Sequence, residues 1–298
     1  MKRDNRVTMT IVGTVAAVAA VVGWLLTPEP TPMKIEQYSE ASELRRYDLA
    51  GDAETLKLDG PLNEISGIAF DDEGRLFGHN DEKGDVYQID PKTGDVLKRF
   101  SLEGKVREDF EGIALVGETF FLVASDGTLY AFEDASDGEE TPYRKIKTPL
   151  KNDNDVEGLC YDLATESLLV ACKEDPGDKD YDDFRAVYSF SLADEALGEK
   201  PRFLIERKRF EKLSDYDEFK PSAIERHPIG GTFFVLGGKG RVVVELSPEG
   251  EVLAAATLDP KRHRQPEGLA FAIDGTMYIA DESAGAGGRI TVYPFRNE

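Results

Sequence analysis

The feature that most constrains the fold is a short segment that recurs five times along the chain. Each copy begins with serine or glutamate, continues with a small residue and runs into an apolar stretch. The five openings are Ser66-Gly67-Ile68, Glu111-Gly112-Ile113, Glu157-Gly158-Leu159, Ser222-Ala223-Ile224 and Glu267-Gly268-Leu269. Successive openings are 45, 46, 65 and 45 residues apart. A period near 45 residues that is built from short strands is typical of the blades of a β-propeller.

The strands of one blade can be followed in the first repeat. Residues 67–70, 75–79, 85–89 and 96–102 predict four strands, and the first and third connections, at 71–74 and 91–94, are tight turns. The second strands of the other repeats are expected at 119–124, 167–172, 232–236 and 276–280. These runs are apolar on both faces, which is what a blade needs when a neighbouring blade covers each side.

The repeats predict an all-β, five-bladed propeller. The last repeat has only three strands before the chain stops, so we expect residues 54–58 to supply its outer strand. Such closure leaves no exposed sheet edge. The 65-residue spacing has too few spare residues for a hidden blade. A six-bladed ring remains the alternative if residues 34–62 pair differently.

The N-terminus predicts a membrane anchor. Residues 7–26 are uncharged and long enough to cross the hydrocarbon core as one helix. Lys2, Arg3 and Arg6 precede them and should stay in the cytoplasm, which places the rest outside, in the periplasm or the extracellular space. A cleaved signal peptide is the rival interpretation. The predicted organisation is a cytoplasmic tail at 1–6, an anchor in the inner membrane at 7–26, a proline-rich linker at 27–45 and a propeller domain at 46–298.

Charge and cysteine content limit the partners and the covalent chemistry. The formal net charge of −22 repels phosphates, so a nucleic-acid partner is not expected. Two cysteines, Cys160 and Cys172, are too few for a disulfide framework. They fall on neighbouring predicted strands, where buried free thiols or a single bridge would both fit.

The propeller topology brings the strand openings to one face, which we call the top face. Glu111, Glu157 and Glu267 should therefore gather around the central axis. Carboxylates so close repel unless they are protonated, hydrogen-bonded or bridged by a cation. Oxygen ligands suit calcium, so the three glutamates are the predicted metal ligands, helped by Asn80 or Asp81. Alternatively, each glutamate accepts local hydrogen bonds, or Lys173, Lys239 or Arg264 neutralises the group.

Other top-face residues follow the second strands. They are candidates for binding a small molecule or a protein partner: Asn80, Asp81, Asp126, Lys173, Lys239, Asp281 and Glu282. Among the three histidines, His79 is the candidate general base because it lies beside Asn80 and Asp81. His227 is expected to be structural, and His263 lies in a basic loop where it could contact an anion.

Several of these segments resemble a known family. The segments 66–81, 110–113, 157–159 and 266–282 resemble the SdiA-regulated family of bacterial propeller proteins over most of residues 60–295. The resemblance implies a propeller with a short N-terminal membrane anchor. The Glu-Gly openings are also similar to those of calcium-dependent lactonase and gluconolactonase propellers. That similarity implies an axial calcium site in which Glu111, Glu157 or Glu267 is a ligand, although Ser66 and Ser222 replace glutamate in two repeats.

Two functions remain open at this stage. The first is a ligand- or partner-binding module of the cell envelope, with calcium as a structural ion. The second is a calcium-dependent hydrolase of lactones or esters, in which the ion would polarise the carbonyl group and His79 or a carboxylate would activate water. Fold alone does not decide between them.

Overall fold

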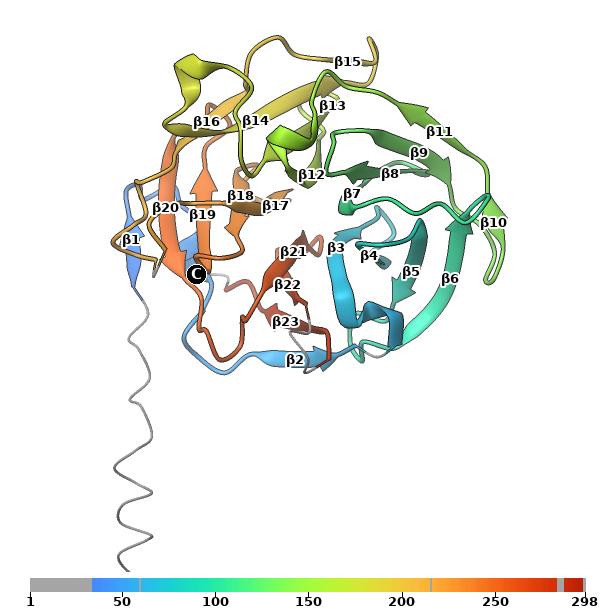
Figure 1. Ribbon diagram of the computed structural model, residues 1–298. Coiled ribbons are helices and arrows are strands. Elements are labelled where there is room, and N and C mark those ends of the chain that lie inside the picture. The colour runs from blue at the N-terminus through green and yellow to red at the C-terminus, as the bar shows by residue number, and fades with distance from the viewer. Residues whose placement is uncertain (1–33, 59, 215, 283–286, 297–298) are drawn as a thin grey trace, which may run out of the picture. The chain divides into compact units, whose positions relative to one another are not determined.

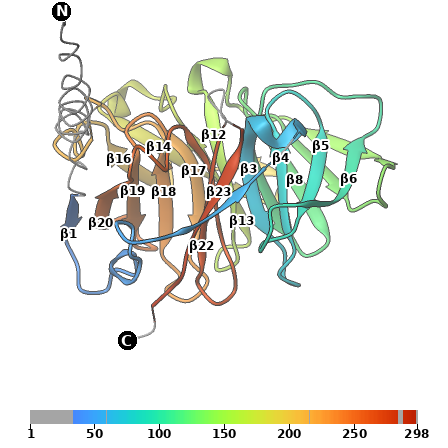
Figure 2. The ribbon, with the colours of Figure 1, turned by 90° about the horizontal axis from the view of Figure 1, so that it is seen from below.

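Five β-sheets are arranged around a central axis in the computed structural model, which describes residues 34–296 except 59, 215 and 283–286. Figure 1 looks along the axis and shows the sheets as successive blades, with one strand of each blade nearest the centre. Figure 2 shows from the side that the strands run between the two faces of the ring. The predicted five-bladed propeller is confirmed.

The blades follow the repeats of the sequence. Blade 1 contains β3 (Ile65–Phe70), β4 (Leu76–Asn80), β5 (Asp85–Ile89) and β6 (Val96–Leu102), and β10 (Glu140–Thr141) lies parallel to β6 at its edge. Blade 2 contains β7 (Phe110–Val116), β8 (Thr119–Ala124), β9 (Leu129–Glu133) and β11 (Tyr143–Ile146). Blade 3 contains β12 (Val156–Asp162), β13 (Ser167–Cys172) and β14 (Phe184–Ser191), and β14 pairs with both β15 (Ala196–Leu197) and β16 (Phe203–Glu206).

The last two blades both take a strand from the N-terminal part of the body. Blade 4 contains β17 (Pro221–Arg226), β18 (Phe233–Gly237), β19 (Val242–Leu246) and β20 (Val252–Thr257), and β1 (Ile35–Gln37) pairs with β20. Blade 5 contains β21 (Pro266–Phe271), β22 (Met277–Asp281), β23 (Arg289–Tyr293) and, as its outer strand, β2 (Glu54–Lys57). The predicted closure by residues 54–58 is therefore confirmed.

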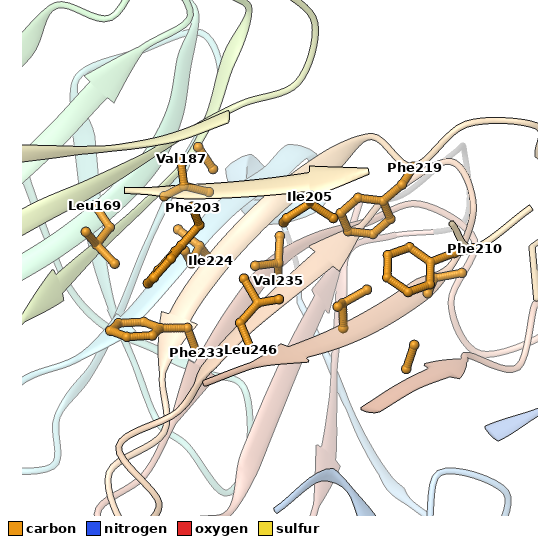
Figure 3. Packing of buried hydrophobic residues seen from close by; sticks show 14 of the residues in the cluster. Leu169, Val187, Phe203, Ile205, Phe210, Phe219, Ile224, Phe233, Val235 and Leu246 are labelled. Atoms are coloured by element: carbon orange, nitrogen blue, oxygen red, sulfur yellow. The ribbon is translucent and has the colours of Figure 1, made fainter. Parts of the chain in front are cut away.

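The core consists of five apolar clusters, one at each interface between blades. Figure 3 shows one of them, in which Phe203 and Ile205 of blade 3 face Phe233 and Val235 of blade 4. Alternate side chains of β18 point to opposite interfaces, because Phe233 belongs to this cluster and Phe234 to the cluster shared with blade 5. The two-sided packing explains why the predicted strands lack an alternation of polar and apolar residues.

The folded body begins earlier than the predicted domain boundary at residue 46. Part of the predicted linker forms β1, and the following segment is held by the buried carboxylate of Glu245 on β19. This carboxylate accepts hydrogen bonds from the Ser42 hydroxyl and from the backbone N–H groups of Glu43 and Leu44. The short 3₁₀ helices are η1 (Leu44–Arg46), η2 (Gly60–Glu64), η3 (Asn152–Asn154) and η4 (Lys179–Tyr181).

Two expectations from the sequence concern the membrane and the thiols. The predicted anchor at 7–26 lies outside the described residues. Within residues 34–296 as described, we find no helix with the length and apolar character needed to cross a bilayer. Cys160 and Cys172 are free and buried, so they form no bridge.

Candidate functional site

Every inner strand has a β-bulge at its recurring opening. The pairing with the second strand shifts between Phe110 and Gly112, and the equivalent shifts in the other blades fall at Ile65/Ile68, Val156/Gly158, Pro221/Ala223 and Pro266/Gly268. The residues left out of the register include Glu111, Glu157 and Glu267. A bulge changes the direction of the extra residue's side chain. The bulges therefore explain why these three carboxylates do not pack in the interfaces between blades.

The glycine after each glutamate is required by close approach of the blades. A Cβ atom on Gly112 would lie 2.8 Å from the backbone nitrogen of Leu159 in blade 3. A Cβ atom on Gly158 would lie 3.0 Å from the backbone nitrogen of Ile224 in blade 4. The Glu-Gly pair thus combines a redirected carboxylate with a strand that packs directly against the next inner strand.

Glu111, Glu157 and Glu267 form an axial cluster, as the sequence predicted. Burial, followed by the negative charges of Glu157, Asp109 and Glu267, raises the pKa of Glu111 to about 10. Burial and the charge of Glu157 raise the pKa of Glu267 to about 8. Burial also raises the pKa of Glu157 to about 7, against the opposing effect of Lys173. Protonation therefore relieves part of the repulsion near neutral pH.

Lys173, at the end of the second strand of blade 3, supplies a positive charge to this cluster. Its ammonium group donates a short hydrogen bond to Glu157 and lies 3.3 Å from the carboxylate of Asp155. Burial alone would lower the pKa of Lys173, but Glu157 and Asp155 outweigh it and raise the pKa above its usual value. The charge of Lys173 also opposes the pKa increases of Glu111 and Glu267.

A lysine ammonium lies beside the glutamates that were predicted to bind calcium. Across the described part of the chain, no group of three histidine, cysteine or acidic side chains is arranged so that it could hold a metal. Glu157, the most buried carboxylate of the cluster, already binds the ammonium of Lys173. The geometry therefore matches the alternative in which a basic side chain neutralises the glutamates.

The two serine openings connect adjacent blades. The Ser66 hydroxyl lies 3.3 Å from a carboxylate oxygen of Glu111, to which it donates. The Ser222 hydroxyl donates to the backbone carbonyl of Pro266 at 2.8 Å. Serine thus substitutes for glutamate where the opening residue binds the next blade.

A pocket of about 290 Å³ opens beside the axial cluster, which supplies Glu157 and Glu267 to its wall. We call it the basic pocket, because five of its seven acidic or basic lining side chains are cationic: Lys173, Lys220, Lys239, Arg241 and Arg264. These residues come from blades 3, 4 and 5 and the loops that join them. Of the predicted ligand-binding residues, Lys173 and Lys239 line this pocket.

Carboxylates also gather on the top face at blades 1, 2 and 5, a region that we call the acidic side: Glu64, Asp81, Asp109 and Glu282. Burial and the charge of Glu64 raise the pKa of Asp81. Burial and the charges of Asp81 and Glu64 raise the pKa of Glu282. The predicted residues Asp81 and Glu282 therefore do lie together.

Three other predicted ligand-binding residues have structural contacts instead. Asn80 is buried, and its side chain accepts a hydrogen bond from the backbone of Lys83. Asp281 is fully buried and accepts a 2.8 Å hydrogen bond from the imidazole of His263. Asp126 is exposed, and its carboxylate accepts a hydrogen bond from the backbone of Thr128 in a turn.

The histidines are all buried. His79 has no exposed surface, and burial lowers its pKa to about 4. Within the described part of the chain its Nε2 atom has no hydrogen-bond partner, and it faces Gly67, so no contact places it against a substrate or a water molecule. His227 contacts Tyr47, as a structural residue would, and His263 lies between Asp281 and Tyr293 rather than near an anion.

Sequence reasoning missed Lys220 and Arg241 in the basic pocket. Lys220 directly precedes β17 of blade 4, and Arg241 ends the turn after β18. A signal was available, because both are basic residues next to top-face positions in an otherwise acidic chain. Their convergence depends on the turn geometry, which the repeat pattern does not describe.

Solved structures show the same fold at low sequence identity. Glutaminyl cyclase from Myxococcus xanthus matches with a TM-score of 0.54 and 14% identity over 90% of this chain and 100% of that chain. The calcium structure of a family AA12 protein from Trichoderma reesei matches with a TM-score of 0.52 and 13% identity, over 84% and 97% of the two chains. The aldose sugar dehydrogenase of Streptomyces coelicolor, in its PQQ-bound form, has a TM-score of 0.52 and 14% identity, over 89% and 99%.

The family comparison is more specific. No curated protein sequence matches the chain. The model of one protein family, however, matches residues 40–286, which include all five blade openings. The match confirms the resemblance of the strand openings and second-strand ends. The chain belongs to the SdiA-regulated family.

Proposed function

We propose that this protein is a ligand-binding module of the cell envelope, whose propeller binds a small molecule in the basic pocket on its top face. The observation that carries the proposal is the pocket itself. Charged side chains from three blades converge there, beside an axial cluster with perturbed pKa values. A concave site with a few convergent polar groups and perturbed titration is the usual form of a binding site.

The location outside the cytoplasm rests on the sequence. An uncharged stretch at residues 7–26 follows Lys2, Arg3 and Arg6, so the propeller would be tethered to the cell membrane on its outer side. Full-length protein should then sediment with membranes after an alkaline wash, and protease added to spheroplasts should digest the propeller. Protection of the propeller from that protease would exclude this orientation.

Neither calcium nor hydrolysis is part of the proposal. Lys173 already provides the positive charge that an axial ion would bring, and His79, the predicted general base, is buried. The lactonase similarity therefore supports the fold and the axial position of the glutamates, while binding is the activity that the arrangement favours.

The pocket is tested with the full-length chain in a non-ionic detergent, using thermal shifts against a library of small anionic, neutral and cationic metabolites. Gln265→Trp narrows the pocket from an exposed position on its wall, so it should abolish the shifts that the wild type shows. Gln37→Trp places the same bulk on the exposed β1 strand, away from the pocket, and should retain them. Binding that survives in Gln265→Trp, or no binding at all, would refute the proposal.

A further inference from the structure

The basic pocket has the opposite charge to the rest of the molecule. The chain carries a formal net charge of −22, yet cationic side chains outnumber carboxylates five to two in the pocket lining. A concentration of one charge inside a concave site raises the local concentration of ligands with the opposite charge.

Three of the five cations have no counter-ion among the described residues. Lys173 is paired with Glu157, and Lys220 is paired with Glu174. Lys239, Arg241 and Arg264 form no ion pair with any carboxylate of the described residues. They come from two connections, since Lys239 and Arg241 belong to the turn between β18 and β19 and Arg264 to the segment before β21.

The backbone at Arg241 has an uncommon conformation. Its φ angle of 48° lies in the left-handed region, where a residue with a Cβ atom is unfavourable and glycine is preferred. The residue before it is a glycine without a positive φ angle. Lys105, Asp155, Glu166 and Glu195 share this conformation, so it sets the direction of the Arg241 side chain and does not by itself mark a site.

We propose that Lys239, Arg241 and Arg264 make the basic pocket a site for a small organic anion, bound through a carboxylate or phosphate group. The planar guanidinium groups of Arg241 and Arg264 match the two oxygens of such a group. The volume of about 290 Å³ limits the ligand to roughly the size of a monosaccharide derivative. The exposed ring of Tyr216 lines the same pocket and offers a face to the carbon skeleton.

The test uses three probes with one carbon skeleton: glucose, gluconate and glucose 6-phosphate. Their binding to the full-length chain in non-ionic detergent is measured by calorimetry near neutral pH and at an ionic strength of about 0.02 M, where charge screening is weak. Gluconate or glucose 6-phosphate is expected to bind at least about tenfold more tightly than glucose, and the stronger of the two identifies the anionic group. Inorganic phosphate and citrate test whether the carbon skeleton contributes.

Variants assign the binding to the pocket. Arg264→Gln and Arg241→Gln should each weaken binding of the anion by about tenfold. Lys92→Gln removes one positive charge from an exposed turn of blade 1 and should change the affinity by less than about twofold. Equal weakening by Lys92→Gln would show a general charge effect and overturn the assignment to these residues.

The inference rests on the proposed function, and different experimental outcomes would refute the anion site and the binding function. If neutral or cationic molecules bind, with binding lost in Gln265→Trp, while the four anions bind no more tightly than about 10 mM, the pocket is a binding site but not an anion site. If no molecule of the library or of the probe set binds, the binding function itself is refuted. Anion binding that persists unchanged in both arginine variants also overturns the inference.

Discussion

The two sides of the top face share one blade architecture but carry opposite charges. On the acidic side, burial and the charge of Glu64 raise the pKa values of Asp81 and Glu282, and the charge of Asp81 also raises that of Glu282. On the other side, Lys239, Arg241 and Arg264 face the basic pocket. The recurring strand openings do not produce this difference, because glutamate and serine openings occur around the whole ring. The charge is set by the connections that follow the second strands and precede the openings.

Lys173 lines the basic pocket and pairs with Glu157 of the axial cluster, and its replacement tests how much this pair stabilises the fold. In Lys173→Met, the buried carboxylate of Glu157 loses its only ion-pair partner in the described structure. Removing one partner of a buried pair costs about 3–5 kcal/mol of unfolding free energy. We expect that loss above pH 8 and a smaller one near pH 5, where Glu157 is protonated in both proteins. Urea unfolding at the two pH values measures it.

Two further variants separate charge from packing in this experiment. The double variant Lys173→Met, Glu157→Gln contains no buried unpaired charge, so it should recover most of the lost stability. Lys239→Met removes an exposed, unpaired cation of the basic pocket and should cost no more than about 0.5 kcal/mol. A loss in Lys173→Met that is independent of pH and persists in the double variant would mean that Lys173 acts through packing alone.

The axial cluster also predicts how stability depends on pH. The pKa of Glu267 is about 8 in the folded protein, above its ordinary value of 4.5. The folded state therefore holds a proton that the unfolded state has lost, so stability falls as the pH rises from about 5 to 8. Glu267→Gln is neutral throughout and should be more stable than the wild type by about 2 kcal/mol above pH 8, with little difference near pH 5.

The control for this effect is Glu249→Gln, which removes the same charge from an exposed turn between β19 and β20. Its stability should follow the wild-type pH profile. If the profile of Glu267→Gln is also parallel to that of the wild type, repulsion within the axial cluster does not affect the free energy of unfolding. The charge difference between the two sides of the top face would then have no effect on stability at the axis.

The sequence was sufficient for the fold because the determinants of a propeller are local and repeated. The opening Glu111-Gly112 predicts both an inner strand and its close approach to the next blade, and residues 54–58 were identified because the last repeat lacks a strand. The structure adds the bulges, which explain how Glu111 can leave a blade interface that Phe110 and Ile113 enter.

The site was only partly predictable, because side-chain direction and pairing are not periodic. The sequence placed His79 and Asp281 on the top face, but both side chains turn into the blade and are buried there. Arg241 was missed because it reaches the pocket through a left-handed turn. The choice between a metal ion and a lysine at the axis depended on the position of one flexible side chain, Lys173.

Calcium binding gives the smallest expected effect and distinguishes most sharply between a lysine and a metal at the axis. With Lys173 in place, calcium should leave the melting temperature of the wild type unchanged within about 1 °C. In Lys173→Met the glutamates are free to bind calcium through their oxygen atoms. At a calcium concentration several times the dissociation constant, the variant should gain about 1 kcal/mol of stability, and its melting temperature should rise by about 2–4 °C. Thermal melts with calcium and with chelator measure both proteins, and the double variant with Glu157→Gln should lose the response.

A calcium-dependent increase of several degrees in the wild type would show instead that the ion displaces Lys173, and that this propeller keeps the axial metal implied by its similarity to the lactonases.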